Sequence, residues 1–84
     1  MNALNAVKRI IAKQMSVPLN QLSAESSLAA LGVESLDVIE IIFALEEKYE
    51  IAIPFNPNES AALGFETIGE VAEAVQKLVR AKGS

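Results

Sequence analysis

Residues 31–54 read LGVESLDVIEIIFALEEKYEIAIP, and this stretch decides the fold class. Its apolar residues recur at spacings of three and four, which predicts a helix from Ser35 to about Glu50. Gly32 marks a turn before this helix, and Pro54 prevents helix after it. The centre of the chain is therefore predicted to be one amphipathic helix.

Two further amphipathic helices flank the central one. The first is predicted over residues 2–15, and the second starts at Thr67, where Thr67 and Glu70 make a capping box. The long connection over residues 16–34 contains apolar side chains that we expect to hold it against the core, namely Leu19, Leu22, Leu28 and Leu31. Residues 55–66 are expected to be irregular, with one short helical turn at 59–63.

The fold class that follows is all-α. We expect a small antiparallel bundle of three main helices, with a short helix or turn before the last one and a long loop between the first two. No segment alternates in the way a half-buried strand does. At 84 residues the chain is predicted to form a single domain, residues 1–84.

Composition excludes many functions. The chain has no Cys and no His, so thiol nucleophiles, disulfides, Cys/His zinc sites and imidazole catalysis are all excluded. A formal charge of −4 argues against binding to nucleic acid. No stretch is long and apolar enough to insert in a membrane, and Lys8, Arg9 and Lys13 interrupt any export signal, so we expect a cytoplasmic protein.

The central helix has two apolar stripes. One is the natural core face and consists of Val38, Ile41, Ile42, Leu45 and Tyr49. The other lies on roughly the opposite side, in the same arc as Glu40, Glu47 and Glu50, and consists of Leu36, Ile39 and Phe43. Either the long loops cover this second stripe, or it is a docking surface for a partner.

Charge is concentrated on the same helix. Residues 34–50 hold six acids and one base, a net of −5, whereas the rest of the chain has a net of +1. Such a face steers basic partners toward it and gives weak, salt-sensitive attachment, although a solvated helix surface has the same composition.

Ser35 opens the central helix. Taken alone it reads as an N-cap, whose hydroxyl accepts a backbone N–H bond. It is a poor candidate for a catalytic nucleophile, because the chain has no His to act as its base.

The segment LGVESLD, residues 31–37, followed by the acidic helix and Pro54, resembles the signature of acyl carrier proteins: a Leu-Gly turn, an Asp-Ser-Leu triplet and an acidic amphipathic helix. The resemblance covers essentially the whole chain. It implies that Ser35 carries a covalent 4′-phosphopantetheine, donated from coenzyme A by a phosphopantetheinyl transferase. The protein would then be a monomeric, non-catalytic carrier of acyl thioesters for enzymes of fatty-acid, lipid or polyketide biosynthesis.

The same resemblance implies a partner-facing surface with basic enzymes as its partners, formed by Glu34, Leu36, Asp37, Ile39, Glu40, Phe43 and Glu47. It also implies an interior cavity for acyl chains, lined by Val38, Ile41, Ile42, Leu45, Ile53, Ile68, Val71 and Val75. Ordinary core packing fits these last residues equally well.

Two departures from the family pattern suggest a specialised carrier. Glu34 stands where the triplet usually has Asp, and residues 54–67, with Phe55 and Phe65, are longer and more apolar than in housekeeping members. The alternatives are an aminoacyl or D-alanyl carrier and an unmodified helical interaction module. An autonomous enzyme has almost no support, since Lys48 is expected to make only a weak surface ion pair with Glu47 or Glu50.

Overall fold

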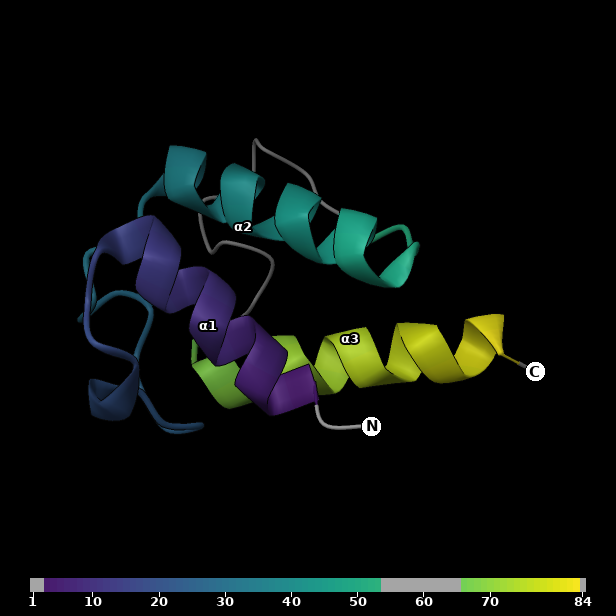
Figure 1. The fold of residues 1–84 in the computed structure, drawn as a ribbon, viewed down its shortest axis with the longest axis horizontal. Helices are drawn as coiled ribbons and strands as arrows, with labels where there is room; N and C mark the ends of the chain where they lie inside the picture. Colours follow the sequence, from purple (N-terminus) through teal and green to yellow (C-terminus); the bar gives the residue numbers. More distant parts are fainter. Residues whose placement is uncertain (1–2, 54–65, 84) are drawn as a thin grey trace.

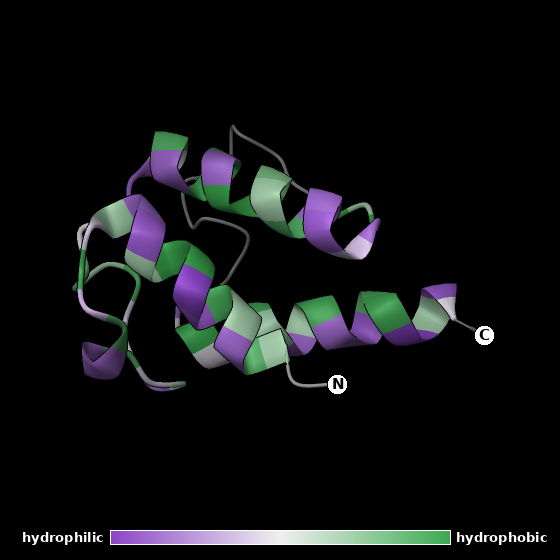
Figure 2. Ribbon diagram, viewed as in Figure 1, coloured by the Kyte–Doolittle hydropathy of each residue, from purple (hydrophilic) through white to green (hydrophobic). Residues whose placement is uncertain are grey.

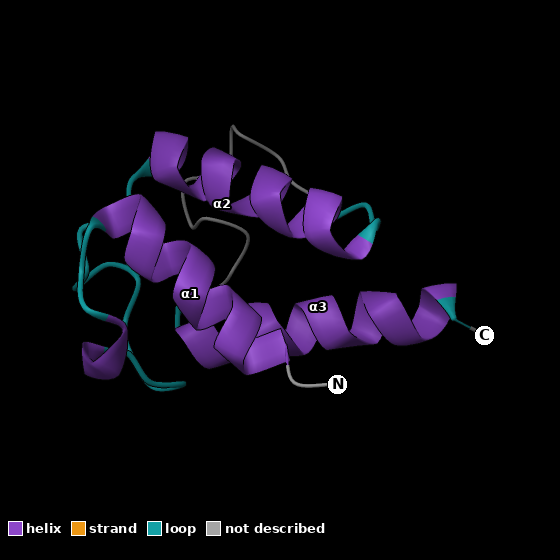
Figure 3. Cartoon of the chain, viewed as in Figure 1, coloured by secondary structure: helices purple, strands orange, loops and turns teal. Residues whose placement is uncertain are grey.

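The computed structural model describes residues 3–53 and 66–83. Its elements are, in chain order, α1 (Ala3–Met15), the 3-10 helix η1 (Leu19–Gln21), α2 (Ser35–Tyr49) and α3 (Ile68–Lys82). Figure 3 shows helices and loops but no strand in this part of the chain. The all-α prediction is confirmed, and each main helix starts or ends within two residues of its predicted bounds.

The three helices form a small bundle in which α1 contacts both of the others. In Figure 1, α2 and α3 run in the same direction, and α1 runs in the opposite sense to both. The antiparallel arrangement therefore holds for α1 against its neighbours. The connection over residues 16–34 lies at one end of the bundle and leads to the start of α2 (Figure 1).

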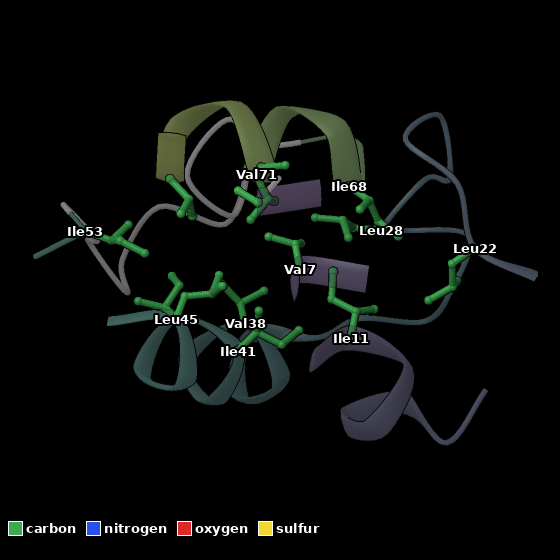
Figure 4. Close-up of a cluster of buried hydrophobic side chains, with 14 residues drawn as sticks. Val7, Ile11, Leu22, Leu28, Val38, Ile41, Leu45, Ile53, Ile68 and Val71 are labelled. Atoms are coloured by element: carbon green, nitrogen blue, oxygen red, sulfur yellow. The ribbon is translucent and has the colours of Figure 1, made fainter. Parts of the chain in front are cut away.

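The core lies where the apolar faces of the helices meet. Green and purple bands alternate along each helix in Figure 2, as amphipathic helices require. In Figure 4, Leu45 and Val38 of α2 point toward Val71 of α3, and Val7 of α1 lies between the two helices. The largest fully buried side chains come from all three helices and are Ile11, Leu45, Ile68, Val7 and Val75.

The connection over residues 16–34 is held to the core by three of its four leucines. Leu22 and Leu28 are buried, and Leu31 packs partly buried against the core. The expectation for Leu19 is wrong, because its side chain is 41% exposed. Leu19 begins η1, whose tight turn is closed by a 3.0 Å bond from the Leu22 N–H to the Leu19 carbonyl, and only Leu22 of this pair reaches the core.

Backbone hydrogen bonds fasten this connection to the start of α3. The Leu28 N–H donates to the Glu66 carbonyl at 2.9 Å, and the Ile68 N–H donates to the Ser26 carbonyl at 3.1 Å. The Gly69 N–H donates to the Ala24 carbonyl at 2.8 Å. A Cβ on residue 69 would lie 2.9 Å from that same carbonyl oxygen, so the contact requires glycine.

The capping interactions of α3 agree with the prediction in part. Thr67 is the N-cap, and its Oγ1 accepts from the Glu70 N–H at 3.2 Å. The Glu70 carboxylate accepts from the Glu66 N–H at 2.6 Å, one residue before the position that a standard capping box uses.

The chain turns sharply after α2. Glu50 has a left-handed backbone with a φ of 53°, and Glu46 Oε2 accepts from the Ile53 N–H at 2.7 Å. This bond returns the buried Ile53 to the core. The turn expected at 59–63, and the residues Phe55 and Phe65, lie outside the described residues. No helix of residues 3–53 and 66–83 has both the length and the apolar character to cross a membrane.

The predicted ion pair of Lys48 with Glu47 or Glu50 is wrong. Lys48 Nζ instead lies 5.8 Å from the centroid of the Tyr49 ring. An ion pair on α3 joins Lys77 to Glu73, at 3.8 Å.

Candidate functional site

Ser35 is exposed at the first position of α2. The turn before it depends on Gly32, whose φ of 79° lies in the left-handed region. The interpretation of Ser35 as the N-cap is wrong. Glu34 is the N-cap, because its backbone is extended and its carbonyl accepts from the Val38 N–H at 2.9 Å. The helix therefore begins without the Ser35 hydroxyl as its cap.

Asp37 closes the first turn of α2 instead. Its Oδ2 accepts from the Glu34 N–H at 3.1 Å, and its Oδ1 accepts from Gln14 Nε2 at 3.1 Å. These two donors, the Glu34 N–H foremost, hold the pKa of the Asp37 carboxyl below its usual range. Asp37 is thus ionised and oriented beside Ser35.

Gln14 was missed by the sequence reasoning. It lies on α1, and its amide also donates to Glu40 Oε2, so it joins two carboxylates of α2. Its position on the polar side of an amphipathic helix was the only signal available. The pairing itself spans 23 residues to Asp37 and 26 to Glu40.

We call Leu36, Ile39 and Phe43 the outer strip of α2. Leu36 is 67% exposed and Phe43 is 63% exposed, and Ile39 is half-buried. The hypothesis that the long loops cover this strip is therefore wrong for Leu36 and Phe43. The predicted acidic residues on the same helix are half-buried at Asp37 and exposed at Glu34, Glu40 and Glu47. The structure brings all seven predicted partner-facing residues together on α2 and its N-cap.

A small apolar pocket lies between α2, α3 and the segment after α2. Its volume is about 20 Å³, room for about one water-sized group. Seven of the eight predicted lining residues are present; Ile68 is instead fully buried in the core, and Ala74 lines the pocket in addition. The lining is Val38, Ile41, Ile42, Leu45, Ile53, Val71, Ala74 and Val75.

Comparison with known proteins shows the family to which this chain is similar. The family described as "Phosphopantetheine attachment site" matches residues 5–75. An acyl carrier protein of Clostridium perfringens (strain SM101 / Type A) is 41% identical over 70 residues, which cover 82% of this chain and 87% of that protein. Acyl carrier protein 4, chloroplastic, of Arabidopsis thaliana is 43% identical over 76 residues, which cover 90% of this chain. This chain spans only 50% of the length of that plant relative.

The fold and the match to the attachment domain define a phosphopantetheine-binding helical domain. Within that class, the chain belongs to the acyl carrier protein family. Members of this family are non-catalytic carriers, and their prosthetic group is a covalently attached 4′-phosphopantetheine. The resemblance seen in residues 31–37 is thereby confirmed.

Proposed function

We propose that Ser35 is the attachment point of 4′-phosphopantetheine and that the protein delivers acyl intermediates to enzymes of fatty-acid, lipid or polyketide biosynthesis. The observation that carries this proposal is the exposure of Ser35 at the first position of α2, where its hydroxyl is not used as the helix cap. An attachment residue must present its oxygen to a second protein, and Ser35 meets that condition.

The start of α2 fits a phosphodiester on Ser35 Oγ. The first N–H groups of a helix lack intrahelical partners, and the positive end of the helix dipole favours negative charge. The Asp37 carboxylate opposes a phosphate by like charge, but both of its oxygens already accept hydrogen bonds, from Gln14 and from the Glu34 N–H. When bound, the arm supplies the thiol that this cysteine-free chain lacks, and that thiol holds acyl groups as thioesters.

The outer strip and its acidic border support docking of basic partner enzymes. Two large apolar side chains, Leu36 and Phe43, stand exposed among carboxylates. Exposed apolar patches with polar rims mark interaction sites, and surface charge speeds encounter without giving tight binding. We assign recognition by the transferase and by acyl-transferring enzymes to Glu34, Leu36, Asp37, Ile39, Glu40, Phe43 and Glu47.

The pocket between α2 and α3 supports an acyl cargo. Its lining consists of aliphatic side chains, which favour a hydrocarbon and disfavour an ammonium group. Its volume of about 20 Å³ is too small for a chain of several methylenes, so α2 and α3 must separate to admit one. The same lining opposes an aminoacyl or D-alanyl cargo. We place the carrier in the cytoplasm, as a monomer, although plant relatives from three species are named chloroplastic.

Intact mass after incubation with coenzyme A and a promiscuous phosphopantetheinyl transferase tests the attachment. We expect the wild-type chain to gain one phosphopantetheine mass and Ser35→Ala to gain none. No gain in the wild type, or an equal gain in Ser35→Ala, rejects the proposal. Loading with acyl and aminoacyl donors then compares the two classes of cargo.

The exposure of Leu36 and Phe43 also suits a second function, an unmodified helical module that grips a partner helix. Complementation of a deletion strain separates the two functions. A carrier requires Ser35, so Ser35→Ala is expected to fail; full complementation by Ser35→Ala would favour the module.

A further inference from the structure

Gln14 of α1 bonds two carboxylates of α2 with one amide group. Its Nε2 donates to Asp37 Oδ1 at 3.1 Å and to Glu40 Oε2. An amide NH₂ has two N–H donors, so each carboxylate receives one of them. Asp37 and Glu40 are three residues apart on one helix and are therefore neighbours on its surface, and the Gln14 amide bonds both despite their like charge.

The bonds continue from Gln14 to the backbone beside Ser35. Asp37 uses its second oxygen to accept the Glu34 N–H at 3.1 Å, and Glu34 directly precedes Ser35. The Glu34 carbonyl in turn accepts from the Val38 N–H at 2.9 Å. Gln14 is therefore linked to the turn that carries Ser35 through a single side chain, that of Asp37.

The chemical nature of Gln14 matters for a surface that basic enzymes recognise. A lysine or arginine at this place would also bond both carboxylates but would cancel part of their charge. The neutral amide orients the carboxylates and leaves both negative charges in place. A carboxylate has about four acceptor positions, so Asp37 and Glu40 retain sites for a partner's cations.

We propose that Gln14 is a positioning residue for the attachment site: by holding Asp37 and Glu40 it orders the acidic first turns of α2 for the transferase that modifies Ser35. This inference rests on the proposed function. The hydrogen bonds of the Gln14 side chain go to Asp37 and Glu40 and not to the Ser35 hydroxyl, so Gln14 acts through the two carboxylates that it orients.

The first test measures the Asp37 carboxyl by NMR in the full chain without its prosthetic group. Gln14→Ala removes one donor and is expected to raise the pKa of Asp37 toward its ordinary value. Gln14→Glu keeps the size of the side chain but places a like charge beside Asp37, and is expected to raise that pKa further. Gln76→Ala, the same substitution on α3, is the control and should leave it unchanged. An Asp37 pKa in Gln14→Ala equal to that of the wild type overturns the proposal.

The second test measures transferase kinetics with the same chains as substrates. We expect the KM of Gln14→Ala to rise about threefold to tenfold, the cost of immobilising about one side chain on binding, with kcat unchanged within about twofold. Gln76→Ala should match the wild type in both constants. An unchanged KM for Gln14→Ala, or a fall in kcat alone, overturns the assignment of Gln14 and leaves Ser35 as the attachment point. A wild-type chain that takes no arm overturns the proposed function and this inference with it.

Discussion

The two sides of α2 carry similar side chains in opposite environments. On the inner side Leu45 is fully buried and Val38 is 7% exposed, whereas on the outer side Leu36 is 67% exposed. Burying a leucine contributes about 1.5–3 kcal/mol to folding, and the outer strip forgoes most of that contribution. The difference indicates that the inner side maintains the fold, and it supports the docking role that we propose for the outer strip.

The charges of α2 divide in the same way. None of the described residues that line the pocket on the inner side is charged, whereas Glu34, Glu40 and Glu47 are exposed. Because the described lining of the pocket is aliphatic, packing on the inner side does not require a carboxylate to enter the pocket. Each side of α2 can therefore be altered separately.

The largest expected effect is on the inner side. Leu45→Ala should lower the free energy of unfolding by about 2–5 kcal/mol, because it leaves a cavity in the core. Leu36→Ala, the same substitution on the outer strip, should change it by no more than about 0.5 kcal/mol. Urea unfolding followed by circular dichroism compares the two. Equal losses would show that the two sides do not differ in their contribution to folding.

Gly32 provides an intermediate effect that involves neither side of α2. Gly32→Ala should lower the free energy of unfolding by about 1–2 kcal/mol, because the φ of 79° at this position is unfavourable for alanine. A clash should not add to this cost, since a Cβ at this position would have no atom within 4 Å. Gly83 has a φ of −79°, so Gly83→Ala is the matched control and should be neutral or slightly stabilising. A neutral Gly32→Ala in thermal unfolding would contradict the strain argument.

On the outer strip, Phe43→Ala is expected to separate binding from stability. Affinity for a phosphopantetheinyl transferase should fall by about fivefold or more, as for truncation of an aromatic anchor. The free energy of unfolding should change by no more than about 0.5 kcal/mol. Titration calorimetry and urea unfolding of the same variant give both values. A stable variant that binds like the wild type would remove Phe43 from the docking surface.

The smallest expected effect is electrostatic. The pKa of Asp37 is lower in the folded chain than its ordinary value, so the ionised carboxylate stabilises the fold above the unfolded pKa, about 3.9. That stabilisation is lost as pH falls through the folded pKa. Wild type should therefore exceed Asp37→Asn in stability at about pH 7, and the difference should shrink below about pH 4. A difference that stays constant with pH would contradict this assignment.

Local patterns predicted most of the fold. The spacing of apolar residues identified α1, α2 and α3, and Thr67 was correctly identified as the cap of α3 because capping depends on residues three positions apart. The prediction that Leu19 packs against the core was wrong, because neighbouring residues in the sequence do not determine which leucine of a loop reaches the core. The candidate site was predicted as far as it depends on one helix.

Ser35 shows where local reasoning failed within the site. A serine just before an acidic helix is a typical N-cap residue. In the structure, however, Ser35 is already the first residue of the helix, one position after the cap. Glu34 then becomes the cap residue, and Asp37 satisfies its N–H. Capping propensities cannot predict the start of a helix to within one residue, because several polar residues at this point can cap it almost equally well.

The helices, the two stripes on α2, the concentration of acidic residues and the serine at the start of α2 could all be predicted from the amino-acid sequence, because each depends on periodicity or on near neighbours. The packing of the helices was needed to show that Leu36 and Phe43 stay exposed, that Ala74 lines the apolar pocket and that Gln14 bonds Asp37 and Glu40. These contacts join residues more than twenty positions apart or depend on what packs over a surface. They arise only when the helices pack together, and no local pattern encodes that packing.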